Sequence, residues 1–237
     1  MSWHEKYKLL VFDEIDSTNS EAIRIAQTSC PQENYVLLAK QQAQGRGRTT
    51  KTWYSSRGNL HSTILLYHHI DSQYISQLSF VTAVAVHSTI TALASKKINN
   101  ITLKWPNDVL INNKKVSGIL IESIKNYLII GVGINIIVSP VNVDQEITNL
   151  SAEGINALSP EEILEIYITN FEKYFNIWKN QGFNKIKQYW LKRSYRLGEK
   201  ITTNDGNSKI TGAFMGLEID GAIKLQLPSG EIYIGRA

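Results

Sequence analysis

Four apolar segments separated only by short turns lie between residues 101 and 138, and this spacing constrains the fold more than any other feature. The first three, at residues 101–105, 108–111 and 116–124, are joined through Pro106-Asn107 and Asn112-Asn113-Lys114, which are typical turn residues. Strands with such short connections pair as antiparallel neighbours. The fourth segment, residues 127–138, is too short to cross a bilayer, which takes roughly 20 apolar residues. The region therefore predicts a buried, hairpin-connected sheet.

Apolar patterns elsewhere predict three more strands and four helices. The strands are expected at residues 7–12, 35–40 and 59–67, and the helices at 18–27, 75–95, 160–178 and 183–191. Thr18 and Glu21 have the spacing of a capping box, and Ser159 stands as an N-cap ahead of Pro160 and Glu162. Strands interspersed with helices predict an α+β fold with a mixed sheet packed by helices.

The chain changes character after Leu197-Gly198. Short strands expected at residues 200–203, 209–218, 222–227 and 231–234 alternate with turn residues such as Asp220-Gly221. About forty residues of this kind are typical of a small β-barrel. We therefore expect two domains, a catalytic domain at residues 1–190 and a small C-terminal β domain at residues 191–237.

Positive charge is concentrated in one stretch of the chain. Residues 34–70 contain no acidic side chain, whereas the net charge of the whole chain is only +4. The basic residues of this stretch are Lys40, Arg46, Arg48, Lys51 and Arg57. In Gly45-Arg46-Gly47-Arg48, glycine allows the backbone to approach a ligand, and arginine offers a planar donor fork for carboxylate or phosphate. The loop predicts an anion site, although a solvated basic loop or an RNA-binding segment has the same composition.

Two further segments carry polar residues where a simple strand or turn does not need them. Lys104-Trp105-Pro106-Asn107-Asp108 is closely followed by Lys115 and Gly118, and a hairpin would bring Asn107, Asp108 and Lys115 together. In Gly131-Val132-Gly133-Ile134-Asn135, the two glycines weaken a strand unless something must approach its backbone closely. Asn135, among isoleucines, needs a polar partner.

Together these segments resemble those of biotin–protein ligases. Five motifs occur in the order and spacing of that family: Asp16-Ser17-Thr18-Asn19; Gln42 with Gly45-Arg46-Gly47-Arg48 and Trp53; Lys104-Trp105-Pro106-Asn107-Asp108; Lys115-Val116-Ser117-Gly118-Ile119-Leu120-Ile121-Glu122; and Gly131-Val132-Gly133-Ile134-Asn135. The resemblance covers nearly the whole chain. It implies a class II synthetase-like catalytic domain of the biotin–lipoate ligase type, followed by a small SH3-like β-barrel.

The resemblance implies an ATP-dependent biotin–[acetyl-CoA-carboxylase] ligase that uses Mg²⁺. Biotin's carboxylate would attack the α-phosphate of ATP, giving biotinyl-5′-AMP and pyrophosphate. A lysine amine of a biotin carboxyl carrier protein would then displace AMP. Two unit charges of like sign 4 Å apart repel by about 4 kcal/mol at an effective dielectric constant of 20, so the first step needs clustered cations.

Residue roles follow from the resemblance by position. Implied biotin contacts are Ser17, Thr18, Asn19, Gln42, Gly45, Arg46, Gly47, Arg48, Lys115 and Gly118. Implied ATP contacts are Arg48, Lys51, Trp53, Asn107, Lys115 and Asn135. Arg46, Arg48 and Lys115 are expected to stabilise charge at the phosphate, and Asp108 to orient the acceptor amine. No metal ligand is identifiable, because Mg²⁺ would bind mainly ATP and water.

The chain departs from the family pattern in two places. Many members continue the basic loop with a further Gly-Arg, whereas Thr49-Thr50-Lys51-Thr52 stands here. Lys51 would supply a point charge in place of an arginine fork, so we expect weaker retention of the adenylate. Some members also begin with a winged-helix DNA-binding domain. This chain starts almost directly with the catalytic motifs, so we expect no DNA partner.

Two alternatives stay open at this level. A lipoate or octanoate ligase or transferase has the same fold, although the arginine-rich segment and glycine triplet usual in such proteins are absent here. A non-enzymatic RNA-binding protein would use the Arg-Gly loop, but only Trp53 and Tyr54 offer stacking surfaces beside it.

The remaining composition fits a cytoplasmic protein. Cys30 is the only cysteine, which excludes an internal disulfide and a cysteine-based zinc site. Neither a signal peptide nor a membrane-spanning segment is expected. The sequence leaves the oligomeric state open, and exposed edge strands would allow a homodimer.

Overall fold

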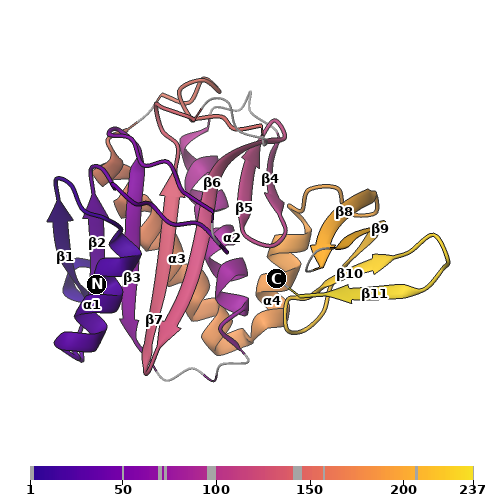
Figure 1. Cartoon of the computed structure of the whole chain (residues 1–237), viewed down its shortest axis with the longest axis horizontal. Coiled ribbons are helices and arrows are strands. Elements are labelled where there is room, and N and C mark those ends of the chain that lie inside the picture. The colour runs from indigo at the N-terminus through magenta and orange to yellow at the C-terminus, as the bar shows by residue number, and fades with distance from the viewer. Residues whose placement is uncertain are drawn as a thin grey trace.

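The computed structural model describes residues 3–49, 51–68, 71, 74–94, 100–140, 146–156, 158–205 and 208–236. Seven strands form one sheet in the order β1-β2-β3-β7-β6-β5-β4 (Figure 1). They are β1 (Tyr7–Phe12), β2 (Asn34–Ala39), β3 (Leu60–Tyr67), β4 (Ile101–Lys104), β5 (Asp108–Ile111), β6 (Lys114–Ile124) and β7 (Tyr127–Ile134). Only β1 and β2 are parallel neighbours, and the rest are antiparallel. The predicted α+β class and hairpin-connected sheet are confirmed.

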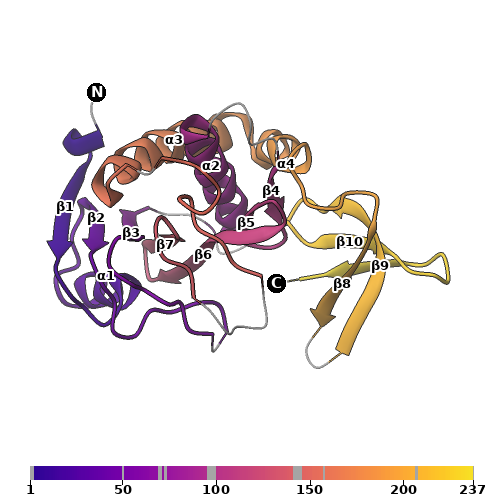
Figure 2. The same cartoon turned by 90° about the horizontal axis from the view of Figure 1, so that it is seen from above.

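Helices cover the two faces of this sheet unequally (Figure 2). The helices are η1 (Trp3–Glu5, one 3₁₀ turn), α1 (Thr18–Thr28), α2 (Gln77–Leu93), α3 (Pro160–Gln181) and α4 (Phe183–Leu191). The large core lies between one face and α2, α3 and α4, whereas α1 covers β2, β3 and β7 on the other face. Toward β6 and β5, that second face lines a cavity. Among the residues described, no helix combines the length and apolar character that crossing a membrane requires.

The two capping predictions have different outcomes. In α3, Ser159 and Glu162 form the expected capping box, each side chain bonding the other residue's backbone N–H. In α1 the cap is Ser17, whose hydroxyl accepts from the Ser20 N–H at 3.5 Å, so the predicted cap at Thr18 is wrong by one residue. An N-cap of this kind stabilises a helix by about 1 kcal/mol. The Thr18 hydroxyl points instead to Gln42, in the cavity.

Several element boundaries also differ from the expectation. Strand β7 ends at Ile134, before the predicted residue 138, because Asn59 Oδ1 accepts hydrogen bonds from the backbone N–H groups of residues 136, 137 and 138. The Asn59 side chain thereby satisfies donors that strand pairing would otherwise use. Helix α2 starts at Gln77 and not at residue 75, and its expected end at residue 95 lies outside the described residues.

The C-terminal β region is a four-stranded antiparallel sheet beside the β4 edge of the main sheet (Figure 1). Its strands are β8 (Lys200–Asp205), β9 (Ser208–Leu217), β10 (Ile223–Gln226) and β11 (Ile232–Gly235), in the order β11-β10-β9-β8. The ring centroid of Phe214 lies 6.3 Å from that of Trp190, and Trp105 Nε1 donates to the Gly221 carbonyl at 3.0 Å. These contacts hold the small sheet where residues of β8 reach the cavity. The expected domain boundary at residues 190–191 stays a prediction.

Candidate active site

One row of residues runs across the open face of the main sheet. Register pairs link, from β2 to β4, Ala39, His61, Gly133, Gly118, Asp108 and Lys104. Gly131 lies two residues from Gly133 and therefore on the same face, because side chains alternate along a strand. Glycines at positions 118, 131 and 133 leave the middle of this face without side chains of its own.

Side chains from other elements occupy the space above these glycines. A Cβ atom on Gly133 would overlap the Trp53 indole, and one on Gly131 would overlap the side-chain oxygen of Asn19. A Cβ on Gly118 would lie 3.0 Å from the Trp53 ring and 3.3 Å from Lys115 Cε. The glycines are therefore required for the close approach of Trp53 and Asn19 to the sheet.

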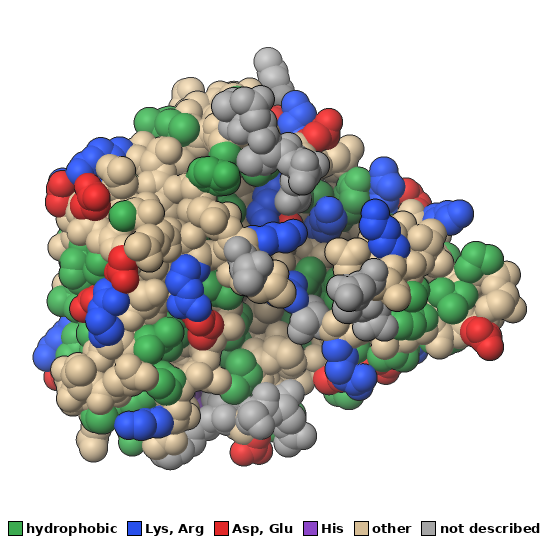
Figure 3. All heavy atoms as spheres, in the orientation of Figure 1, with side chains coloured by type: hydrophobic (Ala, Val, Ile, Leu, Met, Phe, Trp, Pro, Cys, Tyr) green, Lys and Arg blue, Asp and Glu red, His purple; other side chains and the backbone are tan. Residues whose placement is uncertain are grey.

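A cavity of about 960 Å³ lies over this row, between the sheet, the Gly-Arg loop and the C-terminal β domain. Among the residues that the structure describes, its charged lining side chains are Arg46, Arg48, Lys51, Lys104, Asp108, Lys115 and Arg236, which is six cations and one carboxylate. Figure 3 shows Lys and Arg side chains gathered around the hollow at this face. Strand β8 contributes Thr202, Thr203 and Asn204 to the same cavity. The site is therefore strongly cationic and is completed by the small domain.

The Gly-Arg loop folds as a hairpin over the sheet. The Trp53 N–H donates to the Gly45 carbonyl at 2.9 Å, and the Gly47 N–H donates to the Lys51 carbonyl at 2.7 Å. Thr49, near the tip, has a φ of 52°, in the left-handed region. Thr50, part of the predicted departure from the family pattern, lies outside the described residues. The hairpin carries Arg46, Arg48 and Lys51 into the cavity lining.

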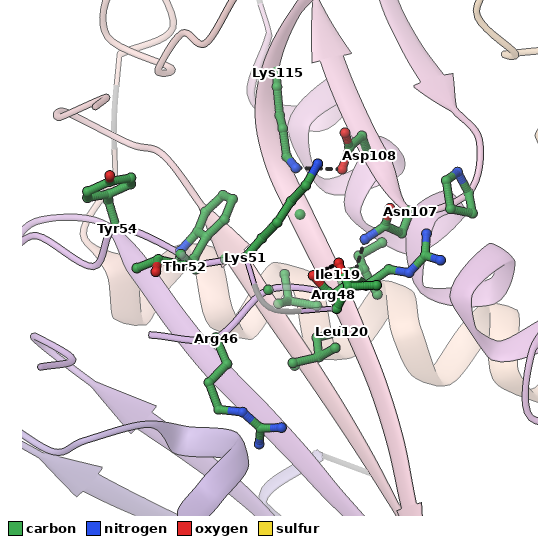
Figure 4. A pocket seen from close by; sticks show the side chains of 18 of the residues that line it. Arg46, Arg48, Lys51, Thr52, Tyr54, Asn107, Asp108, Lys115, Ile119 and Leu120 are labelled. Carbon is green, nitrogen blue, oxygen red and sulfur yellow. Dashed lines mark hydrogen bonds and ion pairs between the residues drawn. The ribbon is translucent and has the colours of Figure 1, made fainter. Parts of the chain in front are cut away.

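The cationic side chains do not all point the same way (Figure 4). Lys115 Nζ forms an ion pair with Asp108 at 2.7 Å, with the two side chains 17% and 13% exposed, and Lys51 extends toward this pair. Burial lowers the pKa of the Arg48 guanidinium, opposed by the charge of Asp108. Arg46 points away from Lys115 and bonds Glu122 on β6. The predicted proximity of Asp108 and Lys115 is confirmed.

Beyond the α1 N-terminus the cavity ends at uncharged polar side chains: Thr18, Asn19 and Gln42 line it, and Ser55 and Thr63 bond to them. Gln42 Oε1 accepts from the Thr18 N–H at 2.8 Å and from the Thr18 hydroxyl at 3.0 Å, and Gln42 Nε2 donates to Ser55 Oγ at 2.7 Å. The Thr63 hydroxyl lies 2.6 Å from Asn19 Oδ1 and 2.7 Å from Thr18 Oγ1. We call these five residues, Thr18, Asn19, Gln42, Ser55 and Thr63, the polar end. The hydrogen bonds among these five residues hold their side chains in place.

Trp53, Asn107 and Asn135 lie around the charged part of the cavity. Asn107 Nδ2 donates to the Ile119 carbonyl at 2.7 Å, and Asn135 Nδ2 donates to the Thr148 carbonyl at 3.1 Å. Within the described part of the chain, the buried Asn135 Oδ1 and Trp53 Nε1 atoms have no hydrogen-bond partner. Both residues line the cavity, so two polar atoms without a partner lie at its wall.

Comparisons with known proteins identify the family. The biotin/lipoate A/B protein ligase family matches residues 11–135, more than half of the chain. A biotin–[acetyl-CoA-carboxylase] ligase of Paracoccus denitrificans is 34% identical over 232 residues, covering 94% of this chain and 95% of the relative. The chain belongs to the biotin–protein ligase family. A bifunctional ligase/repressor of Bacillus subtilis is 30% identical and covers 94% of this chain, which spans 70% of that protein.

A solved relative has the same architecture as this member of the ligase family. The biotin protein ligase of Aquifex aeolicus, in complex with biotin and ATP, has a TM-score of 0.80 and 28% identity to this chain. The match covers 97% of this chain and 99% of the Aquifex chain. The shared fold therefore includes both the main sheet and the C-terminal β domain.

Most residues that the sequence implied for a biotin–protein ligase line the one cavity. They are Ser17, Thr18, Asn19, Gln42, Arg46, Gly47, Arg48, Lys51, Trp53, Asn107, Asp108, Lys115, Gly118 and Asn135. Gly45 is not in the lining. A Cβ atom there would overlap the Trp53 carbonyl oxygen, so Gly45 serves the base of the hairpin. The Ser17 hydroxyl caps α1, so its expected ligand contact competes with helix capping.

Sequence reasoning missed several residues of this ligase site. His61 is 1% exposed and lines the cavity, and burial lowers the pKa of its imidazole. Thr63, Ser55 and Glu122 bond directly to predicted residues. For His61 and Thr63 the available signal was their spacing of two residues along a strand, which puts both on one face. For Arg236 and β8, nothing in the sequence indicated a place in the cavity lining.

Proposed function

We propose that this chain activates biotin with ATP and transfers it to a lysine of a biotin carboxyl carrier protein. The family makes it an ATP-dependent biotin–protein ligase. One observation supports the assignment of the two substrates within the cavity: a neutral, hydrogen-bonding end and a cationic end are joined across bare glycines. Biotin has matching chemistry, because an uncharged ureido ring and a carboxylate stand at the two ends of an apolar chain.

The polar end would bind the ureido group. That group presents two N–H donors and one carbonyl acceptor, and Thr18, Asn19, Gln42 and Thr63 offer hydroxyl and amide groups of both kinds. Most of the hydrogen bonds needed to orient these side chains are already made within the protein. Little rearrangement would be required on binding, which favours affinity.

The cationic end would stabilise the activation step. Biotin's carboxylate oxygen attacks the α-phosphorus of ATP, the bond to the bridging oxygen breaks, and pyrophosphate leaves. Arg48, Lys51 and Lys115 would offset the repulsion between the two anions, which is about 4 kcal/mol for unit charges 4 Å apart at an effective dielectric constant of 20. Arg46 would join them only by leaving Glu122. Trp53, Asn107 and Asn135 would contact the adenosine.

Mg²⁺ enters this proposal as the counter-ion of ATP. Within the described residues, no group of three or more His, Cys, Asp or Glu side chains is positioned to hold a metal. Asp108 is the one carboxylate among the lining residues described, and it is paired with Lys115. We therefore assign no protein ligands to the ion and route no step through it.

Asp108 would act in the second step. The acceptor lysine nitrogen attacks the carbonyl carbon of biotinyl-AMP, the bond from that carbon to the phosphate oxygen breaks, and AMP leaves. An incoming amine that replaces Lys115 as the partner of Asp108 would be held by a charge-assisted hydrogen bond. Orientation of this kind is a large part of catalysis in two-substrate reactions.

The acceptor is a carrier protein of the biotin carboxyl type. The Paracoccus relative is named for acetyl-CoA carboxylase as its substrate, and we propose the same acceptor class here. The cytoplasmic location and the absence of a DNA partner stay predictions from the sequence, which leaves the oligomeric state open.

Isotope exchange between pyrophosphate and ATP tests the proposal. We expect exchange that depends on biotin and is not supported by octanoate. Exchange with octanoate alone would favour the lipoate-type alternative. Folded protein that exchanges with neither acid but retains RNA on a filter would favour the RNA-binding alternative.

A further inference from the structure

Glu122 joins the two ends of the cavity, although it is not among the lining residues. It lies on β6 four residues after Gly118, so its side chain is on the same face of the sheet. Its Oε1 atom accepts from Arg46 Nη2 at 2.7 Å. Its Oε2 atom accepts from Arg46 Nη1 at 3.2 Å and from Asn19 Nδ2 at 2.9 Å. One carboxylate thus bonds both the hairpin and the polar end.

Two acceptors orient the Asn19 amide: the Glu122 carboxylate at 2.9 Å from Asn19 Nδ2, and the Leu120 carbonyl oxygen at 3.5 Å. An ionised carboxylate only accepts hydrogen bonds, so Asn19 must present its NH₂ group to Glu122. Asn19 Oδ1 is consequently turned toward the Thr63 hydroxyl, 2.6 Å away. Asn19 is only 4% exposed, so little solvent reaches its amide to stabilise the reverse orientation. Glu122 therefore sets which group the polar end offers to a ligand.

The same carboxylate holds the hairpin against the sheet. The two guanidinium nitrogens of Arg46 meet the two oxygens of Glu122, the bidentate geometry that makes such pairs strong. An isolated exposed ion pair stabilises little, but this one shares an oxygen with a buried amide. Moving the hairpin therefore disturbs Asn19, and reorienting Asn19 disturbs the hairpin.

We propose that Glu122 is a positioning residue that couples the Gly-Arg hairpin to the polar end of the cavity. Resting on the proposed function, this inference adds that binding of the ureido ring and placement of the hairpin favour each other. A ligand whose polar groups match the Asn19 orientation set by Glu122 would bind while the hairpin is already in contact with the sheet. Without the Glu122 charge, binding of the ureido ring and placement of the hairpin would no longer depend on each other.

The test removes the charge while keeping the size, with Glu122→Gln. For the ligand-free variant we expect several-fold faster trypsin cleavage after Arg46, Arg48 and Lys51, mapped by mass spectrometry. The biotin Kd measured calorimetrically without ATP should rise about tenfold, the range for a lost hydrogen bond to a charged group. The KM for biotin should rise while kcat changes little, a split that general destabilisation would not produce.

A double variant and a matched control sharpen the test. Because the pair is shared, adding Glu122→Gln to Arg46→Gln should not accelerate cleavage after Arg48 further. Glu218→Gln breaks an ion pair of the same 2.7 Å length, to Lys224 in the C-terminal β domain, and should leave cleavage and biotin affinity unchanged. If the control changes both readouts as much as Glu122→Gln does, the assignment to Glu122 is wrong.

Failure of this inference is distinguishable from failure of the proposed function. Native protein that binds no biotin would overturn the proposed function. Native protein that binds biotin, together with a folded Glu122→Gln variant of unchanged Kd and cleavage rate, would overturn only the role of Glu122. If Glu122→Gln does not fold, Arg46→Gln removes the same ion pair by changing its more exposed member. Unchanged cleavage after Arg48 and Lys51 in that variant would then overturn the inference.

Discussion

The polar end and the cationic end of the cavity are organised in opposite ways. Thr18, Asn19, Gln42 and Thr63 bond to one another, and Thr18, Asn19 and Thr63 are almost fully buried. At the cationic end Lys115 pairs with Asp108 inside the cavity, whereas Arg236 and Arg46 pair with carboxylates that are not lining residues, those of Asp220 and Glu122. The first region is preorganised by the protein, whereas the second contains more positive charge than its own acids neutralise.

This contrast follows from what each end would bind. A neutral ureido ring has a fixed set of donors and acceptors, so rigid, satisfied partners select it at little entropic cost. A polyphosphate brings its own negative charge, and cations held close together without it repel one another. The excess charge is therefore placed on the hairpin and beside β8. The predictions below would break or sharpen this contrast.

The largest effect is expected from Lys115→Ala. Removing a charge that stabilises the phosphate in the transition state should slow adenylate formation by about 10² to 10³-fold. Binding of the uncharged analogue biotinamide, which would use only the polar end, should be unchanged. Single-turnover formation of biotinyl-AMP measures the first effect, and calorimetry with biotinamide measures the second. We expect Arg48→Ala to behave alike, and a full single-turnover rate in either variant would remove that residue from charge stabilisation.

Asp108→Asn is expected to separate the two chemical steps. The change removes the carboxylate that would orient the acceptor amine, so transfer from preformed biotinyl-AMP should fall about 10 to 100-fold. Adenylate formation should fall far less, since Lys115 then keeps its full charge for the phosphate. Rapid-quench transfer to a purified carrier domain provides the measurement. An unchanged transfer rate would exclude Asp108 from the second step.

Alanine substitutions at the two glycines of β7 should affect different ends of the cavity. In Gly131→Ala the new methyl group overlaps Asn19, so the affinity for biotinamide should fall about tenfold or more. In Gly133→Ala the new methyl group overlaps Trp53, so the KM for ATP should rise instead. Each variant is the control for the other, because both add one methyl group to the same strand. Equal effects on both ligands in both variants would show that the two ends are not separate.

Thr63→Val should weaken the polar end alone. The substitution keeps the shape and removes the hydroxyl that lies 2.6 Å from Asn19 Oδ1 and 2.7 Å from Thr18 Oγ1. Two buried groups lose a partner, at about 1 to 3 kcal/mol of folding stability, and biotin affinity should fall about tenfold. Thr169→Val is the control, since that exposed hydroxyl donates to the Glu165 carbonyl within helix α3, away from the cavity. A biotin Kd unchanged in folded Thr63→Val would contradict preorganisation.

Local geometry explains how much of this site was predictable. Asp108 and Lys115 lie on neighbouring strands joined by a short turn, so their meeting follows from hairpin pairing, and the same argument yields β4 to β7. The ion pair of Arg46 with Glu122 joins residues 76 positions apart, on elements whose contact depends on how the whole sheet is ordered. The contact of β8 with the cavity depends on domain packing, through Trp105 and Phe214. No local pattern encodes either of these contacts.

The smallest expected effect is a difference in salt dependence between the two ends. Raising ionic strength from 0.1 to 1 M shortens the screening length from about 10 to 3 Å, which weakens attraction between ATP and the exposed cations. The KM for ATP should therefore rise several-fold. Biotinamide carries no charge and would meet a buried, neutral end, so its Kd should stay within about twofold over the same range. Titrations of both ligands at increasing potassium chloride concentration provide the measurement. Equal salt dependence of the two ligands would mean that the hairpin cations also control binding at the polar end. That result would be expected if the coupling through Glu122 dominated binding.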